Sequence, residues 1–214
     1  FLHFVSQLGE YELHGVELPG KAAQRAAQIP NIHLKIGTLE RNDFAADTFD
    51  AITMFHVVEH LPNPPELLSI LAQIVKPNGV AIISFPNIDS WQSRFFKGKW
   101  LHLDPPRHLY FFAPTDFSRE MKKMGFETIE TKYFNPEYNP FGLLQSLLNC
   151  FTERRDVLYE HLKNNRTYTA NYSRFSLWLQ ILFFLAIFPF CILVDAVEAF
   201  FRKSGTVEMV FRKQ

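Results

Sequence analysis

Two histidines and a glutamate stand close together after an apolar run of the sequence. His56, Glu59 and His60 are spaced i, i+3, i+4, so one helical turn would bring their side chains to one face. Imidazole and carboxylate groups placed in this way can remove a proton from a substrate or bind a divalent metal ion. Glu59 and His60 can instead hold their loop by hydrogen bonds to the backbone. We favour this structural role over a metal site, and we keep His60 as a candidate base.

A second candidate base lies in the segment 104–108, DPPRH. The ordinary pKa of histidine suits proton removal near neutral pH, which makes His108 a catalytic candidate. Arg107 suits an anionic group such as a phosphate or a carboxylate. In the structural alternative, Asp104 and Arg107 form a salt bridge and His108 packs on Trp100. The sequence leaves both interpretations open.

The elements that would position these groups alternate between short apolar runs and helical patterns. This alternation predicts an α/β fold, with a parallel sheet and crossover helices over residues 1–100. The strand patterns lie at 12–17, 33–36, 49–55, 80–85, 126–134 and 206–212. The helical patterns lie at 1–8, 20–28, 64–74 and 114–124, with a turn at 76–79 and an aromatic-rich loop at 88–113.

Polar residues end two of the predicted strands, where α/β sheets bind their ligands. Glu17 ends the strand 12–17, and its carboxylate can accept hydrogen bonds from both hydroxyls of a ribose. Thr38, Leu39 and Glu40 follow the next strand. The Leu39 N–H could meet a ring nitrogen of a base, and Thr38 or Glu40 could accept from an exocyclic amine. A solvated glutamate and a polar turn are the alternatives.

A glycine-rich turn that grips a nucleotide should begin about 20 residues before such an acidic residue. Counting back from Glu17 leads to a point before Phe1, and no two of the nine glycines are spaced as G-x-G. We therefore expect this chain to be a fragment that lacks one strand and its nucleotide-binding turn.

Three segments carry a resemblance to a known family: FDAITMFHVVEHLPNP, KPNGVAIISFPN and WLHLDPPRHLYFF. Together they resemble the class I S-adenosylmethionine-dependent methyltransferases, in the branch of the ubiquinone-biosynthesis-type O-methyltransferases and many bacterial enzymes, also described as methyltransferase-domain-23-like. The resemblance covers 1–134 and 205–213, and we expect 1–134 and 205–214 to form the methyltransferase core. It implies a three-layer, Rossmann-like sheet of seven strands whose last strand is antiparallel. The chain departs from the family in lacking the glycine loop and in carrying Thr38 where such proteins often have Asp.

The resemblance also implies roles for individual residues. Glu17 with Leu18 would hold the ribose of S-adenosylmethionine, Thr38, Leu39 and Glu40 would lie against the adenine, and Phe55 with His56 would line the methionine side. In ubiquinone-type enzymes the 56–60 stretch is associated with a metal ion, but its first position there is acidic and here is His56. Glu59 and His60 are therefore the ligands to consider if a metal binds.

A hydrophobic segment interrupts the predicted core between its last two strands. We expect residues 135–204 to form a helical insertion or lid, within which Phe175–Val194 contains no charged residue. Its length matches one membrane crossing. A single crossing would separate the last strand from its sheet, so the segment must lie in the membrane interface, dip in and return near Pro189, or pack on the protein. Flanking basic residues and Trp178 favour peripheral contact through 175–194.

The composition narrows the classes of function. Twenty-two basic and 22 acidic residues give no net charge, which argues against a nucleic-acid partner. Cys150 and Cys191 show no disulfide or metal spacing, so we expect a cytoplasmic protein, peripheral on the inner membrane face.

We thus predict an S-adenosylmethionine-dependent O-methyltransferase with an apolar or lipid-linked small-molecule acceptor. The alternatives are a non-catalytic methyltransferase-like module that acts as a membrane-associated scaffold, and a nicotinamide-dependent oxidoreductase. The oxidoreductase shares the role of Glu17 but does not account for the EHLPNP and PPRHL segments.

Overall fold

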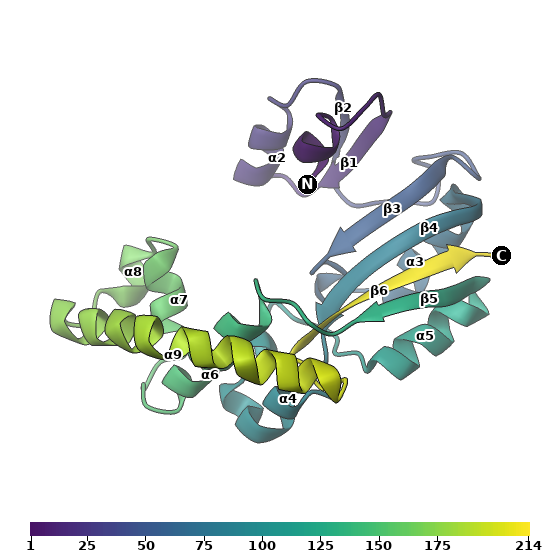
Figure 1. The fold of residues 1–214 in the computed structure, drawn as a ribbon. Helices are drawn as coiled ribbons and strands as arrows, with labels where there is room; N and C mark the ends of the chain where they lie inside the picture. Colours follow the sequence, from purple (N-terminus) through teal and green to yellow (C-terminus); the bar gives the residue numbers. More distant parts are fainter. The chain divides into compact units, whose positions relative to one another are not determined.

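The apolar runs of the sequence form the strands that their pattern predicts. A computed structural model describes all residues, 1–214, and divides them into two units, Phe1–Ala45 and Ala46–Gln214 (Figure 1). The first unit contains α1 (Leu2–Val5), β1 (Leu13–Glu17), α2 (Lys21–Ala26) and β2 (Ile32–Ile36). Its two strands are parallel, with Glu17 opposite Ile36, so their carboxyl ends share one edge.

The second unit is built on a four-stranded sheet in the order β3-β4-β6-β5. These strands are β3 (Phe49–Phe55), β4 (Val75–Pro86), β5 (Phe126–Lys132) and β6 (Thr206–Lys213). β3 is parallel to β4, and β6 runs antiparallel to both of its neighbours, β4 and β5. The predicted antiparallel last strand is confirmed. The chain contributes six strands in two sheets, whereas the resemblance implies a single sheet of seven.

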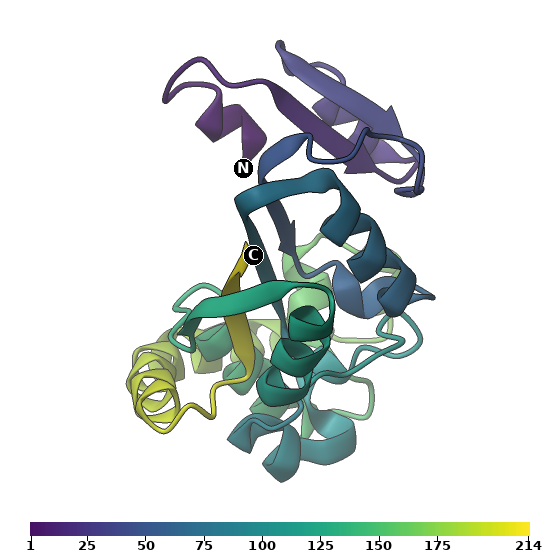
Figure 2. The same ribbon diagram turned by 90° about the vertical axis from the view of Figure 1, so that its right-hand side faces the viewer.

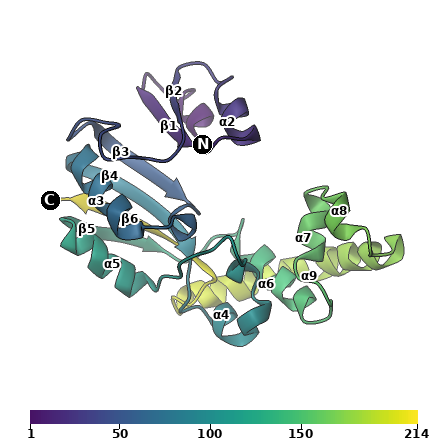
Figure 3. The same ribbon diagram turned by 180° about the vertical axis from the view of Figure 1, so that it is seen from behind.

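Burial of β4 and β6 forms the centre of this unit. Every second residue of β4 is fully buried from Ala81 to Phe85, and Met209 and Phe211 of β6 are buried beside them. Helices α3 (Pro64–Ile74) and α5 (Pro114–Lys123) cover one face of the sheet (Figure 3). This packing holds the carboxyl ends of β3 and β4 in fixed positions.

Two local predictions need correction. The predicted loop 88–113 contains α4 (Trp91–Phe96) and two 3₁₀ turns, Lys97–Lys99 and Leu101–Leu103. The Ser90 hydroxyl accepts from the Ser93 N–H and caps α4, a local signal within an aromatic-rich stretch. The predicted turn 76–79 lies inside β4, beside a shift in its pairing with β3. A Cβ atom at Gly79 would lie 2.8 Å from the Lys76 carbonyl oxygen, so only glycine fits this irregularity.

The hydrophobic segment between β5 and β6 is helical, as predicted. It contains α6 (Asn139–Asn149), α7 (Val157–Leu162), α8 (Arg166–Thr169) and α9 (Arg174–Phe200). Leu143, Leu144 and Leu148 of α6 share a core cluster with Cys191 of α9. These helices belong to the same unit as the four-stranded sheet. The division into a core, 1–134 and 205–214, and an insertion, 135–204, stays a prediction.

Helix α9 is one continuous helix of 27 residues that includes Pro189. The return near Pro189, one of the alternatives in the sequence, is therefore wrong. Proline has no N–H, so the helix loses one backbone hydrogen bond at this position. The turns before and after Pro189 remain helical. Figure 2 shows α9 nearly end-on as it leads into β6.

Two carboxyl groups of α9 face the protein interior. Asp195 and Glu198 are buried, and Glu198 Oε2 accepts a hydrogen bond of 2.7 Å from Gln92 Nε2. Asp195 Oδ2 accepts from the Asn135 N–H at 3.3 Å. Burial raises the pKa of Asp195 to about 6 and the pKa of Glu198 to about 7, because it penalises the charged carboxylate.

The raised pKa of Glu198 predicts that the protein loses stability as the pH increases. The protonated form is favoured in the folded state, so the free energy of unfolding should fall between about pH 4.5 and pH 7. In Glu198→Gln the loss above about pH 6 should disappear, because the loss that remains comes from Asp195, whose pKa is raised to about 6. At pH 8 the variant should exceed the wild type by about 1–2 kcal/mol in urea unfolding. Glu153→Gln, on the exposed surface, is the control. A Glu198→Gln protein less stable than the wild type at pH 8 would contradict the prediction.

Candidate functional site

The carboxyl ends of β1 and β2 bring together the predicted nucleotide-binding residues of the first unit. The Gly37 N–H donates to the Glu17 carbonyl at 2.9 Å, where the two strands end. The side chain of Glu17 is half-buried, and its Oε1 accepts from the Leu18 N–H at 3.0 Å. Gly37 has φ of +134°, a conformation that glycine adopts readily. A carboxylate thus stands at the tip of β1, as the sequence predicts.

The loop after β2 carries the predicted adenine contacts. Thr38 and Glu40 are exposed and Leu39 is half-buried. Asp43 fixes the loop, because its Oδ2 accepts from the Glu40 N–H at 2.6 Å and pairs with Lys35. The hydrogen bond from Lys35 lowers the pKa of Asp43, so this carboxyl group is ionised at neutral pH.

In the second unit, Phe55 and His56 stand at the carboxyl end of β3. His56 has φ of +54°, an unusual value for a side chain of this size. Its N–H donates to the Ser84 carbonyl of β4 at 3.0 Å, and its Nδ1 donates to Glu59 Oε1 at 3.2 Å. The ring of Tyr138, just before α6, lies 4.6 Å from the His56 ring. The helical segment therefore borders the end of β3.

Two loops that are distant in sequence meet at Glu59. The backbone carbonyl of Glu59 accepts from the N–H groups of Leu109 and Tyr110, at 2.8 and 3.2 Å. The Tyr110 hydroxyl donates to the Pro62 carbonyl at 3.0 Å. The imidazole rings of His60 and His108 lie 4.6 Å apart across this junction. The 56–60 and 104–110 segments thus form one site.

Hydrogen bonds to backbone carbonyls fix the tautomers of both histidines. His60 Nδ1 donates to the Arg107 carbonyl at 3.0 Å, and His108 Nδ1 donates to the His102 carbonyl at 2.6 Å. The Nε2 atom of each neutral ring therefore keeps a lone pair. Glu59 is fully buried, and its Oε2 has no hydrogen-bond partner.

Each of Glu59, His60 and His108 has a ligand atom within 4.8 Å of those of the other two. Two imidazole nitrogens and one carboxylate oxygen are a common ligand set for a divalent cation, and carbonyl acceptors commonly orient such histidines. The unpartnered carboxylate oxygen of Glu59 and the lone pairs of the two Nε2 atoms are all hydrogen-bond acceptors, so they cannot bond to one another. A cation, in contrast, can take such atoms as ligands. His108 was not among the metal ligands that the sequence suggested.

The segment around His108 contains the salt bridge of the structural interpretation, and the role of His108 as a base stays a prediction. Arg107 pairs with Asp104 at 2.7 Å, as in the structural interpretation. Asp104 Oδ2 lies 4.0 Å from His108 Nε2. Burial lowers the pKa of His108, so its ring is neutral at neutral pH. His108 can therefore accept a proton while Arg107 and Asp104 hold the loop.

His102 is a neighbour of this site that the sequence reasoning did not single out. Burial lowers its pKa to about 3, and the His56 ring stacks on it at 6.4 Å. A Cβ atom at Gly142 of α6 would lie 2.6 Å from His102 Nε2, so glycine is needed for this contact. The presence of two histidines in LHLDPPRHL could have indicated that His102 belongs to the site. Its contact with Gly142 could not be predicted, because Gly142 is distant in the sequence.

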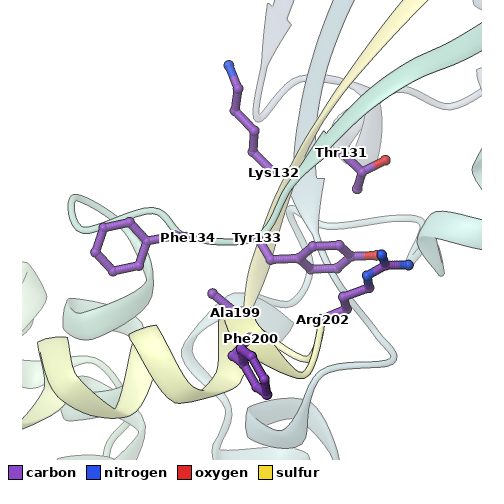
Figure 4. Close-up of a pocket in the computed structure, with 7 residues that line it drawn as sticks. All are labelled: Thr131, Lys132, Tyr133, Phe134, Ala199, Phe200 and Arg202. Carbon is purple, nitrogen blue, oxygen red and sulfur yellow. The ribbon is translucent and has the colours of Figure 1, made fainter.

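The predicted residues fall into two groups. Glu17, Leu18, Thr38, Leu39 and Glu40 belong to the first unit, and Phe55, His56, Glu59, His60 and His108 belong to the second. The complete cofactor site therefore stays a prediction. A hollow of about 410 Å³ lies between the end of β5 and the last turn of α9 (Figure 4), and none of these residues lines it.

Known proteins resemble this chain in sequence and in fold. The sequence model of a family described as a methyltransferase domain matches residues 3–131. A ubiquinone biosynthesis O-methyltransferase of Aromatoleum aromaticum is 27% identical over 110 residues, 49% of this chain and 46% of that protein. Another of this name, from Dechloromonas aromatica, is 32% identical over 146 residues, 65% of this chain and 58% of that protein. The chain thus spans about half the length of these relatives.

A solved structure shares the fold of the chain at low sequence identity. It is an S-adenosylmethionine-dependent methyltransferase from Mesorhizobium loti, with a TM-score of 0.55 and 12% identity. The match covers 99% of this chain and 85% of that chain. A Rossmann-like arrangement of the α/β elements is therefore confirmed.

The three convergent acceptors predict that Glu59, His60 and His108 together bind a divalent cation such as Zn²⁺. Calorimetric titration with Zn²⁺ should use a His33→Ala background, because Glu12, His14 and His33 form a second group of close ligand atoms. In that background His108→Ala should lower the affinity at least about tenfold. His3→Ala is the control. An unchanged affinity in His108→Ala would exclude this residue as a ligand.

Proposed function

The chain belongs to the methyltransferase-domain family of the class I S-adenosylmethionine-dependent methyltransferases, and from this membership we propose that it methylates the oxygen of an apolar or lipid-linked small molecule. The observation that carries the proposal is the presence of polar residues at two strand ends, Glu17 as the last residue of β1 and His56 directly after β3, in a chain of this family. The ubiquinone biosynthesis relatives are named as O-methyltransferases, which supports oxygen as the acceptor atom.

The family resemblance assigns the cofactor contacts to residues at the carboxyl ends of β1, β2 and β3. The Glu17 carboxylate would accept hydrogen bonds from the ribose hydroxyls beside Leu18, and Thr38, Leu39 and Glu40 would contact the adenine. Phe55 and His56 would line the methionine end. Thr38 and Glu40 are exposed, so their polar groups are accessible to a ligand without rearrangement of the loop.

Methyl transfer requires alignment of the acceptor and removal of its proton. The bound cofactor would supply an electrophilic methyl group with a neutral thioether as the leaving group, and the residues of the chain would align the acceptor oxygen and remove its proton. His108 or His60 accepts the hydroxyl proton at Nε2, whose lone pair is available because Nδ1 donates to a backbone carbonyl. The proton then passes to solvent through His60, which is exposed.

A divalent ion at this site would be held by Glu59, His60 and His108. When bound, such an ion supplies Lewis acidity that lowers the pKa of an acceptor hydroxyl. Glu59 then orients the site in two ways, since its carbonyl anchors the 104–110 segment and its Oε1 fixes His56.

An apolar acceptor is supported by the helical segment beside the site. It leaves β5 and returns to β6 at the edge where β4 ends, because Lys132 and Pro86 both pair near the start of β6. An 18-residue window of helix α9 has a mean hydropathy of 2.6, and only 11% of that window is buried. Peripheral contact of 175–194 with a membrane would bring a lipid-linked acceptor to the Tyr138 side of the histidine site.

Glu17→Gln should weaken cofactor binding about tenfold to a hundredfold, because a charge-assisted hydrogen bond contributes about 1.5–3 kcal/mol. The measurement is calorimetric titration of the full-length protein with S-adenosylhomocysteine. Glu10→Gln, an exposed neighbour, should bind like the wild type.

The wild-type titration also separates the two candidate functions. Binding of S-adenosylhomocysteine supports the enzyme. No heat and no thermal shift, together with binding to vesicles, would replace the enzyme by the membrane-associated scaffold.

Co-sedimentation with vesicles tests the membrane contact. The full-length protein should pellet with vesicles that contain phosphatidylglycerol, and Leu185→Glu with Leu193→Glu should leave it in the supernatant. Both leucines are exposed on α9, so the double variant should keep its fold. Phe4→Glu, exposed in the first unit, is the control. Wild-type protein that stays in the supernatant would refute the contact.

A further inference from the structure

Four aromatic side chains from two distant segments form an exposed patch in the second unit. Trp91 and Phe95 belong to α4, and Phe200 and Phe201 lie at the end of α9; these four residues are called the aromatic patch below. Phe95 is 77% exposed and Phe200 is 82% exposed. The rings of Trp91 and Phe201 lie 5.3 Å apart, and the Trp91 N–H donates to the Lys203 carbonyl at 3.0 Å. The backbone thus holds both parts of the patch together.

Helix α9 continues this apolar surface along its whole length. Its exposed side carries only apolar side chains between its terminal charges, among them Phe175, Trp178, Leu182, Leu185, Phe190, Leu193 and Val197. Its polar side chains Gln180, Asp195 and Glu198 are buried. A water-exposed helix has the opposite arrangement. The outward side of α9 therefore suits an apolar environment rather than water.

The charges around this surface are positive. Of the charged residues on α9 and in the turn after it, Arg174 and Arg202 are exposed, one at each end, and Lys203 is half-buried. Lys97, after α4, is exposed too. Asp89 offsets part of this charge, because it pairs with Lys203 at 4.0 Å and with Arg94 at 2.8 Å. An apolar strip with cations at its ends and aromatic rings beside them matches the interface of an anionic bilayer.

The hollow of Figure 4 adjoins the same surface. Arg202 and Phe200 line it together with Tyr133, whose hydroxyl end lies beside the Arg202 guanidinium. A cation at the rim of an apolar surface is where the phosphate groups of a membrane would lie.

We propose that the aromatic patch and the exposed side of α9 form one docking surface for an anionic lipid bilayer, with α9 lying in the plane of the membrane. The inference rests on the proposed membrane contact and adds its orientation and a second anchor outside 175–194. Helix α6 packs along the opposite side of α9, so lipid cannot surround the helix. If α9 crossed the bilayer, β6 would also be separated from β5, with which it pairs from Phe126 to Lys132.

Tryptophan fluorescence can measure this orientation. Trp91 and Trp178 are exposed, whereas Trp100 is buried. Trp178→Phe keeps Trp91 as the exposed reporter, and Trp91→Phe keeps Trp178. With phosphatidylglycerol vesicles that carry bromine at known depths in their acyl chains, both reporters should be quenched by the shallow bromines. Trp178 quenched and Trp91 unquenched would refute the second anchor while leaving the membrane contact intact.

A reporter at the middle of α9 distinguishes a helix in the plane from one that crosses. Leu185→Trp, in the background of Trp91→Phe and Trp178→Phe, should be quenched by shallow bromines. Strongest quenching by bromines near the bilayer centre would overturn the proposal. Leu185 is 62% exposed, so a larger ring should fit without disturbing the core.

Removal of the aromatic rings tests the anchor itself. Phe95→Ser and Phe200→Ser should each lower the partition into phosphatidylglycerol vesicles about tenfold, and Phe4→Ser should not. Unchanged partition in both patch variants would refute the anchor. A different outcome would be that no reporter is quenched and that ultracentrifugation shows a dimer, which Phe200→Ser dissociates. In that case a second copy of the chain covers this surface, and the proposal of a membrane as its partner is refuted. Binding of S-adenosylhomocysteine reports on the proposed activity separately in every case.

Discussion

The antiparallel placement of β6 between β4 and β5 is the constraint on which the second unit depends. Because β6 begins beside Pro86 and Lys132, all of the chain between β5 and β6 must leave and return at the carboxyl edge of β4. That edge also carries His56 and Glu59. Strand pairing therefore places the helices beside the histidine site. The same pairing argues against a membrane crossing by α9, because a crossing would separate β6 from β4 and β5.

Glu59 connects this constraint to chemistry. A buried carboxylate without a full set of partners is costly. Here Glu59 Oε2 has no partner, and a ligand atom of Glu59 lies within 4.8 Å of ligand atoms of His60 and His108. The same residue anchors the 104–110 segment by its carbonyl. Backbone carbonyls orient His60 and His108 so that their Nε2 atoms remain acceptors. This arrangement fits either a proton or a cation, and either would serve the hydroxyl activation that we propose.

Much of the fold was predictable from local sequence patterns, but the contacts between distant segments were not predictable. Helix α3 matches its predicted bounds because Asn63 caps it and Pro64 begins it. The positions of Glu17 and His56 at strand ends were predictable because residue types at strand ends are visible in the sequence. The partnership of His108 with Glu59, and of His102 with Gly142, depends on tertiary packing. The aromatic patch joins residues more than one hundred positions apart, so no sequence window could contain it.

The polar side of α9 explains how its apolar side can remain outward. Glu198 accepts from Gln92 in α4, and Asn139 Oδ1 accepts from both the N–H and the hydroxyl of Thr206 at 2.7 Å. These bonds tie α9, α4 and α6 to the first residue of β6. A helix held by such buried hydrogen bonds cannot rotate to hide its apolar side without leaving several polar groups unpaired. The network therefore fixes the orientation of the sheet with respect to whatever covers α9, and under the proposed function it would also fix the direction from which an acceptor reaches the histidines.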